Sequence, residues 1–302
     1  LKSIVFQTYA DLEIVCISSV ESDEISKILD KYETLDSRIR VYRKKSLDFV
    51  IENTNGKYIA FVDSNHWMML NLYQTFINAL NELNQDIDMY IFNGAVYING
   101  QNDILPSTLI TLSDWKNHFS PHSIHSCQDC TTPFSGNVSL VNKIYKKEFL
   151  LQHIEKFKDF NEYHKDYVYL ILFLNAKSII VTDEVLFRFR IVDAEASNDK
   201  NPFDVFEVID ILDRELRNSN LYEHLKYAFF QFKYNTYLKH FLCCTEDLKE
   251  KYFITMKCNL DYKLYPDLDF NICQRLRDYE LYCLIQQNNF QDFKTILGKE
   301  LI

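Results

Sequence analysis

Short strand-like and helix-like segments alternate through the first half of the chain, and this alternation restricts the fold more than any other feature of the sequence. Apolar, often β-branched runs predict strands at Leu12–Ile17, Arg38–Tyr42, Tyr58–Val62, Ile87–Phe92 and Ser178–Thr182. Apolar residues at helical spacing predict helices between them, near 22–29, 45–55 and 70–83. Strands that alternate with helices usually pair in parallel through right-handed crossovers, so we expect an α/β fold with a mixed, mostly parallel sheet flanked by helices.

The pattern changes twice farther along the chain. Residues 94–133 read as an irregular insertion, and helical spacing returns at Asn142–His153 and Lys165–Asn175. Beyond Pro202 the spacing is helical throughout the recognisable segments, namely Asp204–Arg217, Tyr222–Leu242 and Ile272–Gln287. We therefore expect one α/β domain at residues 1–200 and an all-helical C-terminal region at residues 201–302.

Composition excludes several classes of function. The 302 residues carry 33 Lys and Arg against 43 Asp and Glu, a net charge of −10, which is the wrong sign for a nucleic-acid-binding protein. The five glycines are not spaced to form a phosphate-binding loop, which argues against dinucleotide-binding Rossmann enzymes and P-loop enzymes. Eight cysteines, of which Cys243 and Cys244 are adjacent, indicate reduced thiols and a cytoplasmic location.

Two apolar stretches bear on membrane binding. The longest purely apolar run, Tyr167–Leu174, is far shorter than the roughly 18 residues that a membrane span requires. The aromatic-rich stretch Tyr222–Phe241 has the spacing of a helix packed against the α/β domain. The alternative is a surface that associates peripherally with a membrane, at its inner face, or with a partner protein.

Polar residues follow two predicted strands and begin one predicted helix. Strand YIAFV leads directly into Asp63-Ser64-Asn65-His66-Trp67, strand LEIVCI leads into Ser18-Ser19, and Asp166 lies at the start of a helix. In open α/β sheets ligands bind beyond the carboxyl ends of the strands. A carboxylate such as Asp63 at a strand tip favours a metal cation, although Asp63 would also suit a helix cap.

Several segments resemble family-2 glycosyltransferases, which have the GT-A fold. GKYIAFVDSNHW resembles the family's GEYIxFLDSDDW segment, and NKIYKKEFL resembles a motif of members that build bacterial surface polysaccharides such as capsule. Four further stretches match other family segments in the right order, namely QTYADLEIVCI, DSRIRVYR, HKDYVYL and AKSIIVTDEVLFRFRI. The resemblance covers roughly Ser3 to Ser197, and several motifs in register are far more specific than one.

The resemblance implies an inverting enzyme that moves a sugar, of the hexosyl type, from a nucleotide-diphosphate donor to a hydroxyl of a glycan or lipid-linked acceptor. It implies that Asp166 is the general base and that a divalent cation, Mn²⁺ or Mg²⁺, assists the departing diphosphate. The implied donor and nucleotide contacts are Ser18, Ser19, Asp63 and Ser64, and the implied metal ligands are Asp63, Asn65 and His66. The implied acceptor or phosphate contacts are Trp67, Asn142, Lys143 and Arg190.

For Asn142, Lys143 and Arg190 the alternative is a solvated surface side chain or a structural hydrogen bond. The sequence also departs from the family's pattern. Asn65 and His66 stand where the family has aspartates, so the cation should bind more weakly. Hydroxyl residues replace the family's acidic pair after LEIVCI. These departures keep open a second hypothesis, a catalytically silent relative that binds a glycan or a partner protein.

Two further features need interpretation. The chain begins within what would be the family's first helix, so we expect either that the family's first strand precedes Leu1 in a longer protein or that another segment takes the place of that strand. His122, His125, Cys127 and Cys130 are four potential zinc ligands, but they come from one short segment and lack the long spacing between ligand pairs. We therefore interpret this segment as a loop on the acceptor side rather than as a zinc site.

Overall fold

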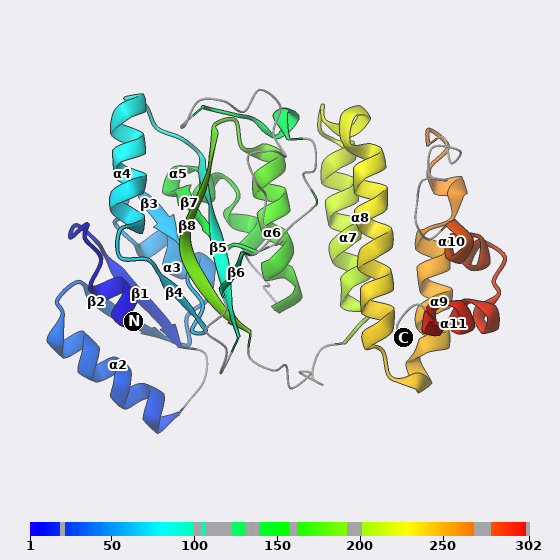
Figure 1. Ribbon diagram of the computed structural model, residues 1–302, viewed down its shortest axis with the longest axis horizontal. Helices are drawn as coiled ribbons and strands as arrows, with labels where there is room; N and C mark the ends of the chain where they lie inside the picture. The colour runs from blue at the N-terminus through cyan, green and yellow to red at the C-terminus, as the bar shows by residue number, and fades with distance from the viewer. Residues whose placement is uncertain are drawn as a thin grey trace. The chain divides into compact units, whose positions relative to one another are not determined.

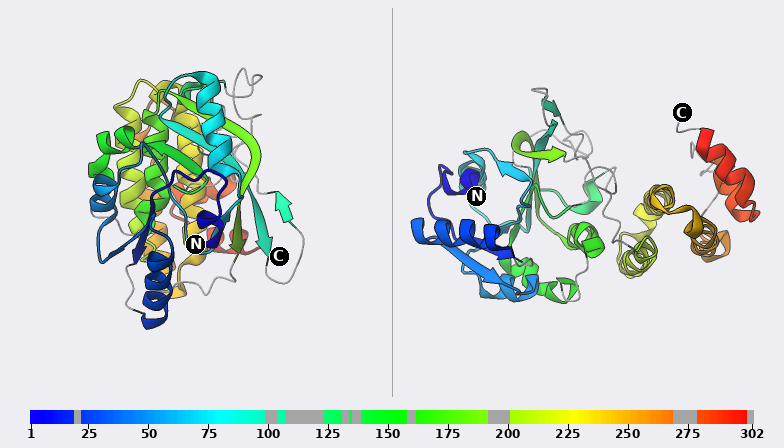
Figure 2. Two further views of the ribbon diagram at one scale, coloured as in Figure 1. Left: turned by 90° about the vertical axis from the view of Figure 1, so that its left-hand side faces the viewer. Right: turned by 90° about the horizontal axis from the view of Figure 1, so that it is seen from below.

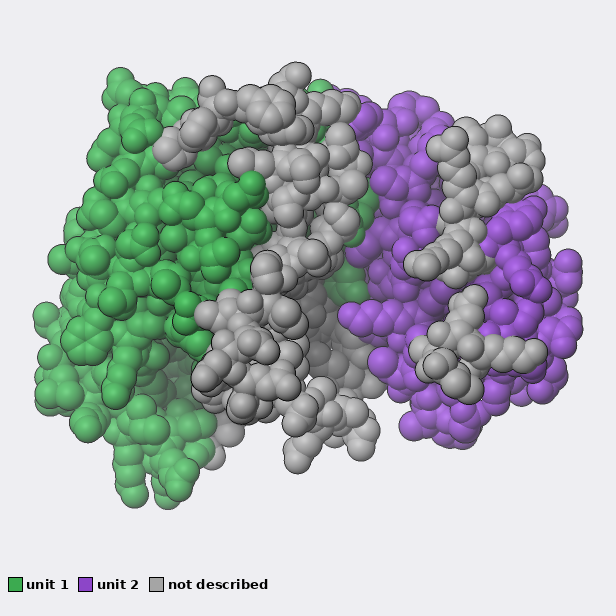
Figure 3. Space-filling view, in the orientation of Figure 1, with its two compact units in different colours: residues 1–196 green, residues 197–302 purple. Residues whose placement is uncertain are grey.

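The computed structural model describes residues 1–18, 22–98, 104–106, 123–130, 134, 139–157, 162–191, 201–268 and 279–299 (Figure 1). Side chains are described in most of these ranges, but not at 96–98, 104–106, 162–166, 189–191 and 298–299. The chain divides into two compact units, unit 1 at Leu1–Ala196 and unit 2 at Ser197–Ile302 (Figure 3).

Unit 1 begins with a short helix and a small parallel sheet. Helix α1 (Lys2–Val5) precedes strands β1 (Ile14–Ser18) and β2 (Ile39–Arg43), which pair in parallel with Ile14 opposite Ile39. Helix α2 (Asp23–Leu35) connects the two strands. Its N-cap residue Ser22 accepts a hydrogen bond from the Ile25 amide, and two acidic residues in its first turn complement the helix dipole.

The larger sheet of unit 1 has six described strands. Five of them follow the order β3 (Tyr58–Ala60), β7 (Lys143–Lys146), β5 (Met89–Ile98), β8 (Ile179–Ile191) and β4 (His66–Met68), and β6 (Ile104–Pro106) pairs with β5. Strands β5 and β8 are parallel, with a bulge next to Asn93, whereas the other neighbours are antiparallel. The mixed α/β class is confirmed, but fewer of the described strand pairs are parallel than the sequence predicts.

Helices cover both faces of this sheet (Figure 1). Helix α4 (Leu72–Leu83) packs its buried residues onto one face, where the rings of Phe76 and Tyr90 lie 5.3 Å apart. Helix α6 (Glu162–Asn175) lies on the opposite face, where the ring of Tyr169 contacts the side chain of Lys143. Unit 1 also contains two shorter α-helices, α3 (Leu47–Asn53) and α5 (Lys147–Gln152).

The structure corrects several predicted elements. The predicted helix Asn142–His153 is wrong over its first half, because residues 143–146 form β7 between β3 and β5 and only α5 is helical. Asn142, the residue before β7, has a left-handed backbone conformation with φ of 62°, which is incompatible with the predicted right-handed helix. Strand β8 continues nine residues past the predicted Thr182, and β4 was not predicted at all. Residues 107–122 of the predicted insertion lie outside the described residues.

Unit 2 is helical throughout its described part. Its helices are α7 (Asp204–Arg217), α8 (Tyr222–Cys243), α9 (Glu246–Asn259), α10 (Tyr279–Gln286) and α11 (Phe290–Lys299). The aromatic residues of α8 pack within the unit, as the 5.1 Å ring contacts of Phe230 with Tyr265 and of Phe241 with Phe293 demonstrate. Within the ranges given above, no helix combines the length and the apolar character that a membrane crossing needs.

Candidate active site

The turn between β3 and β4 carries the polar residues that follow the YIAFV strand. Asp63, Ser64 and Asn65 are exposed, and the turn closes with a hydrogen bond from the His66 amide to the Asp63 carbonyl oxygen at 3.1 Å. The Asp63 carboxylate, 66% exposed, lies 3.7 Å from Nδ1 of His66. The turn therefore brings one carboxylate and one imidazole together at the tip of the sheet.

His66 differs from the other residues of the turn because it is largely buried. Its side chain is 12% exposed and packs edge-to-face against Phe187, with ring centroids 5.9 Å apart. Burial lowers the pKa of His66, and the nearby Asp63 carboxylate opposes this change. A neutral imidazole is the form that binds a metal ion, so this environment is compatible with the ligand role expected of His66.

A pocket of about 530 Å³ lies beside this turn. The described residues that line it are Leu1, Lys2, Ser3, Ile28, Tyr32, His66 and Trp67. Its wall includes α1, which lies beside β4 at the edge of the sheet (Figure 2). The Met68 amide donates to Ser3 Oγ at 3.2 Å, and the Gln7 side-chain amide donates to the Met69 carbonyl at 2.8 Å. Of the candidate metal ligands, His66 lines this pocket, whereas Asp63 and Asn65 lie outside its described lining.

The candidate base Asp166 lies near the start of α6, on the face of the sheet opposite α4. The path of the backbone is described at this position, but the side chain lies outside the described residues. The same holds for Arg190 near the end of β8, and Ser19 is entirely outside the described ranges. Ser18 is the last residue of β1, and its carbonyl accepts from the Lys44 amide at 3.0 Å.

Asn142 and Lys143 are both buried, with exposed fractions of 2% and 1%. The Lys143 ammonium donates to the carbonyls of Ser139 at 2.7 Å and Val141 at 3.2 Å and to Oδ1 of Asn142 at 2.7 Å. The side-chain amide of Asn142 in turn donates to the Phe92 carbonyl at 2.9 Å. These contacts fit the structural alternative for both residues and leave the ammonium no exposed face toward a phosphate.

The segment that contains the potential zinc ligands is only partly described. His122 lies outside the described residues, whereas His125 bridges to Ile179 of the sheet and Cys127 and Cys130 are buried and form no disulfide. Burial raises the pKa of Cys127, which disfavours the thiolate that zinc requires. Among the residues that the structure describes, no three His, Cys, Asp or Glu side chains converge as a metal site.

Arg188 was not among the candidate residues of the sequence, but the strand pairing places it next to Trp67. It lies on β8 directly opposite Trp67 of β4, because these strands pair with Trp67 in register with Arg188. Its Nε atom is buried and has no hydrogen-bond partner among the described residues. The alternating LFRFRI stretch could have placed Arg188 on one face of a strand. Its position beside Trp67 depends on strand β4, which was not predicted.

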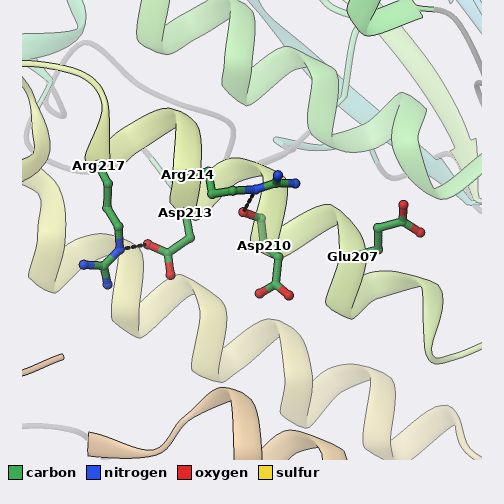
Figure 4. Close-up of a pocket in the computed structure, with 5 residues that line it drawn as sticks. All are labelled: Glu207, Asp210, Asp213, Arg214 and Arg217. Atoms are coloured by element: carbon green, nitrogen blue, oxygen red, sulfur yellow. Dashed lines mark hydrogen bonds and ion pairs between the residues drawn. The ribbon is translucent and has the colours of Figure 1, made fainter. Parts of the chain in front are cut away.

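A second pocket lies in unit 2 and has a different character (Figure 4). Its described lining comes from one helix, α7, through Glu207, Asp210, Asp213, Arg214 and Arg217. Most of these charged groups already have partners within the unit. Arg217 Nε donates to Asp213 at 2.8 Å, Asp213 accepts from Tyr265, and Arg214 donates to the Asp210 carbonyl at 3.3 Å. Two of these contacts lie within α7, and Lys233 of α8, 3.7 Å from both Asp210 and Asp213, connects α7 to α8.

Comparison with known proteins places these features in a family. Residues 1–166 match the family described as Glycosyl transferase family 2. An uncharacterized glycosyltransferase of Rickettsia felis is 24% identical over 220 residues, which cover 63% of this chain and 35% of that protein. Glycosyltransferase GlyA of Streptococcus pneumoniae is 28% identical over 102 residues, covering 31% of this chain and 15% of that protein. The chain thus spans about a third or less of the length of these two relatives.

Solved structures share the fold. The structure of S. aureus TarS residues 1–349 in complex with UDP-GlcNAc has a TM-score of 0.68 and 14% sequence identity, and the match covers 99% of this chain and 86% of that one. This likeness confirms the GT-A architecture predicted from the motifs. Because the family match covers more than half of the residues, this chain belongs to glycosyl transferase family 2.

Proposed function

We propose that this chain carries the catalytic domain of an inverting glycosyltransferase, which moves a sugar from a nucleotide-diphosphate donor to an acceptor hydroxyl. The observation that carries the proposal is the family match over residues 1–166. The match spans the Asp63–Trp67 segment beside the pocket and ends at Asp166. The GT-A fold shared with TarS, whose structure was solved with UDP-GlcNAc, supports the same donor class.

The turn after β3 would hold the diphosphate end of the donor. A Mg²⁺-like cation in such sites needs one or two protein carboxylates, because substrate phosphates and water complete its coordination. Asp63 would supply one carboxylate, and the neutral imidazole of His66, 3.7 Å from it, would supply a nitrogen ligand. Asn65 is exposed in the same turn. An imidazole ligand favours Mn²⁺ over Mg²⁺. The bound cation would supply charge neutralisation for the leaving diphosphate.

Donor recognition would involve the hydroxyl groups of Ser18, Ser19 and Ser64, and Trp67 in the pocket wall would contact the sugar or the acceptor. Asp166 would accept the proton of the acceptor hydroxyl, on the side of the sugar opposite the leaving group. The NKIYKKEFL stretch supports an acceptor in bacterial capsule or other surface-polysaccharide assembly, presented as a glycan or on a lipid.

The test compares the wild type with Asp166→Asn. Release of the nucleotide diphosphate is measured with a panel of nucleotide sugars and polysaccharide acceptors, and donor affinity is measured by calorimetry. We expect turnover to fall by about 10²–10⁴-fold with donor affinity retained, as for the loss of a general base. The control is Asp247→Asn, an exposed aspartate near the start of α9, which should retain full turnover. Unimpaired turnover of Asp166→Asn would remove this residue from the mechanism.

A second function is favoured by one specific observation, the presence of Asn65 and His66 where the family has aspartates. In that case the chain is a catalytically silent relative that binds a glycan or a protein. Calorimetric titration with nucleoside diphosphates separates the two functions. A silent binder shows no increase in affinity when Mn²⁺ is added, whereas the enzyme does.

A further inference from the structure

The backbone of Arg188 lies beside that of Trp67, which lines the pocket next to the turn. On β8 it pairs with Trp67 of β4 on one side and with Ala95 of β5 on the other. Its neighbour Phe187 belongs to the core that packs against α4. Successive side chains of a strand point to opposite faces, so Arg188 and Trp67 point to the other face, on which α6 lies.

Arg188 also differs from the other arginines whose side chains the structure describes. Each of those has an acceptor: Arg38 pairs with Asp36, Arg40 with Glu13, Arg43 with Asp30 and Arg217 with Asp213, and Arg214 bonds the Asp210 carbonyl. Arg188 is half-buried, and its buried Nε has no hydrogen-bond partner among the described residues. A guanidinium stays charged at any physiological pH, so burying one of its donors without an acceptor is unfavourable.

We propose that Arg188 binds a phosphate oxygen of the donor's diphosphate and is a binding residue that the chain's motifs did not reveal. The inference rests on the proposed function, since it names a further contact of the same site. A guanidinium matches the geometry of phosphate oxygens, and such an oxygen would accept from the Nε donor that has no partner among the described residues. The guanidinium would also offset part of the diphosphate charge, because Asn65 and His66 bring no negative charge to hold a cation.

A phosphate on the acceptor would satisfy the same guanidinium, and the experiment separates the two sources. Calorimetry first identifies which of UDP, GDP, CDP, ADP and dTDP the wild type binds in the presence of Mn²⁺. The affinity of Arg188→Gln for that nucleotide and for the matching nucleoside is then compared with the wild type. Arg43→Gln is the control, because Arg43 is an exposed strand arginine paired with Asp30.

For the nucleoside diphosphate we expect Arg188→Gln to bind on the order of ten- to a hundredfold more weakly, as for loss of a hydrogen bond to a charged group. The affinity of Arg188→Gln for the nucleoside should equal that of the wild type. The affinity of Arg188→Lys for the nucleoside diphosphate should lie between those of the wild type and Arg188→Gln, because an ammonium keeps the charge but not the paired donors of a guanidinium. Arg188→Gln should melt no lower than the wild type, since the substitution removes a buried donor without a partner.

Three results would overturn the inference. Unchanged diphosphate affinity in Arg188→Gln would exclude the donor contact and leave an acceptor phosphate as the remaining source, while the proposed function stands. Equal losses for the nucleoside and the diphosphate, or a lower melting temperature, would make Arg188 a structural residue. A wild type that binds none of the five nucleotides with Mn²⁺ would overturn the proposed function together with this inference.

Discussion

Replacing Lys143 by methionine is expected to destabilise unit 1 without weakening nucleotide binding by the folded chain. The Lys143 side chain is 1% exposed and donates to the Ser139 and Val141 carbonyls and to Oδ1 of Asn142. It also lies 3.9 Å from the centroid of the Tyr169 ring. Methionine fills a similar volume, but it leaves all three acceptors without this donor.

The expected magnitude follows from these contacts. An acceptor left unsatisfied in the interior costs roughly 1–3 kcal/mol, and three are affected. Burial lowers the pKa of Lys143, because the charged form loses hydration, and methionine removes this unfavourable term. We therefore expect a net loss of about 3 kcal/mol. For a unit of this size each 1 kcal/mol lowers the melting temperature by about 2–4 °C, so the decrease should be about 6–12 °C.

The assay is thermal unfolding followed by circular dichroism, together with calorimetric titration of the nucleotide. Lys57→Met is the control, because Lys57 is 64% exposed and its ion pair with Asp86 should contribute less than about 1 kcal/mol. A Lys143→Met protein that melts with the wild type but loses nucleotide affinity would refute the reasoning, since it would make the ammonium a ligand contact.

Two further predictions concern the sheet and the turn. Gly94→Ala should lower the free energy of unfolding, measured with denaturant, by about 1–3 kcal/mol, because a Cβ at Gly94 would lie 2.0 Å from the buried Phe187 ring. An unchanged free energy of unfolding would mean that the ring can move away at no cost. Since the folded-state pKa of His66 lies below its usual 6.5, the unfolded chain takes up the proton first, and stability should decrease as the pH falls from 6.5 toward the folded-state pKa. His66→Gln should flatten that pH dependence, and an unchanged slope would assign it to another group.

The sequence predicted the elements that have a strong local pattern. The apolar runs of β1, β2 and β3 and the spacing of α2, α4, α7 and α8 were recognisable because their apolar residues form local patterns in the sequence. Strand β7 was predicted as a helix because its apolar residues also fit helical spacing, and only pairing between β3 and β5 decides the outcome. Strand β4 has three residues and is defined by its pairing with β8, which no local pattern reveals.

The candidate site was predictable to a similar extent. The Asp63–Trp67 segment was found because it follows a buried strand and resembles a family motif, and the structure places it beside a pocket. Lys143 was a candidate phosphate contact because it falls in a motif that resembles the family, with a structural hydrogen bond as the alternative, and its burial and three internal hydrogen bonds fit that alternative. Arg188 was missed because its proximity to Trp67 depends on the long-range register of β4 and β8.

The most direct test of the account is whether Mn²⁺ and a nucleoside diphosphate bind together at the turn after β3. In a nuclear magnetic resonance titration, paramagnetic Mn²⁺ broadens signals of nuclei close to it. We predict that Mn²⁺ broadens the His66 imidazole and Trp67 indole signals more strongly when the nucleotide is present, and that Asp63→Ala abolishes this effect. Unaffected His66 and Trp67 signals in the presence of both ligands would contradict the central claim.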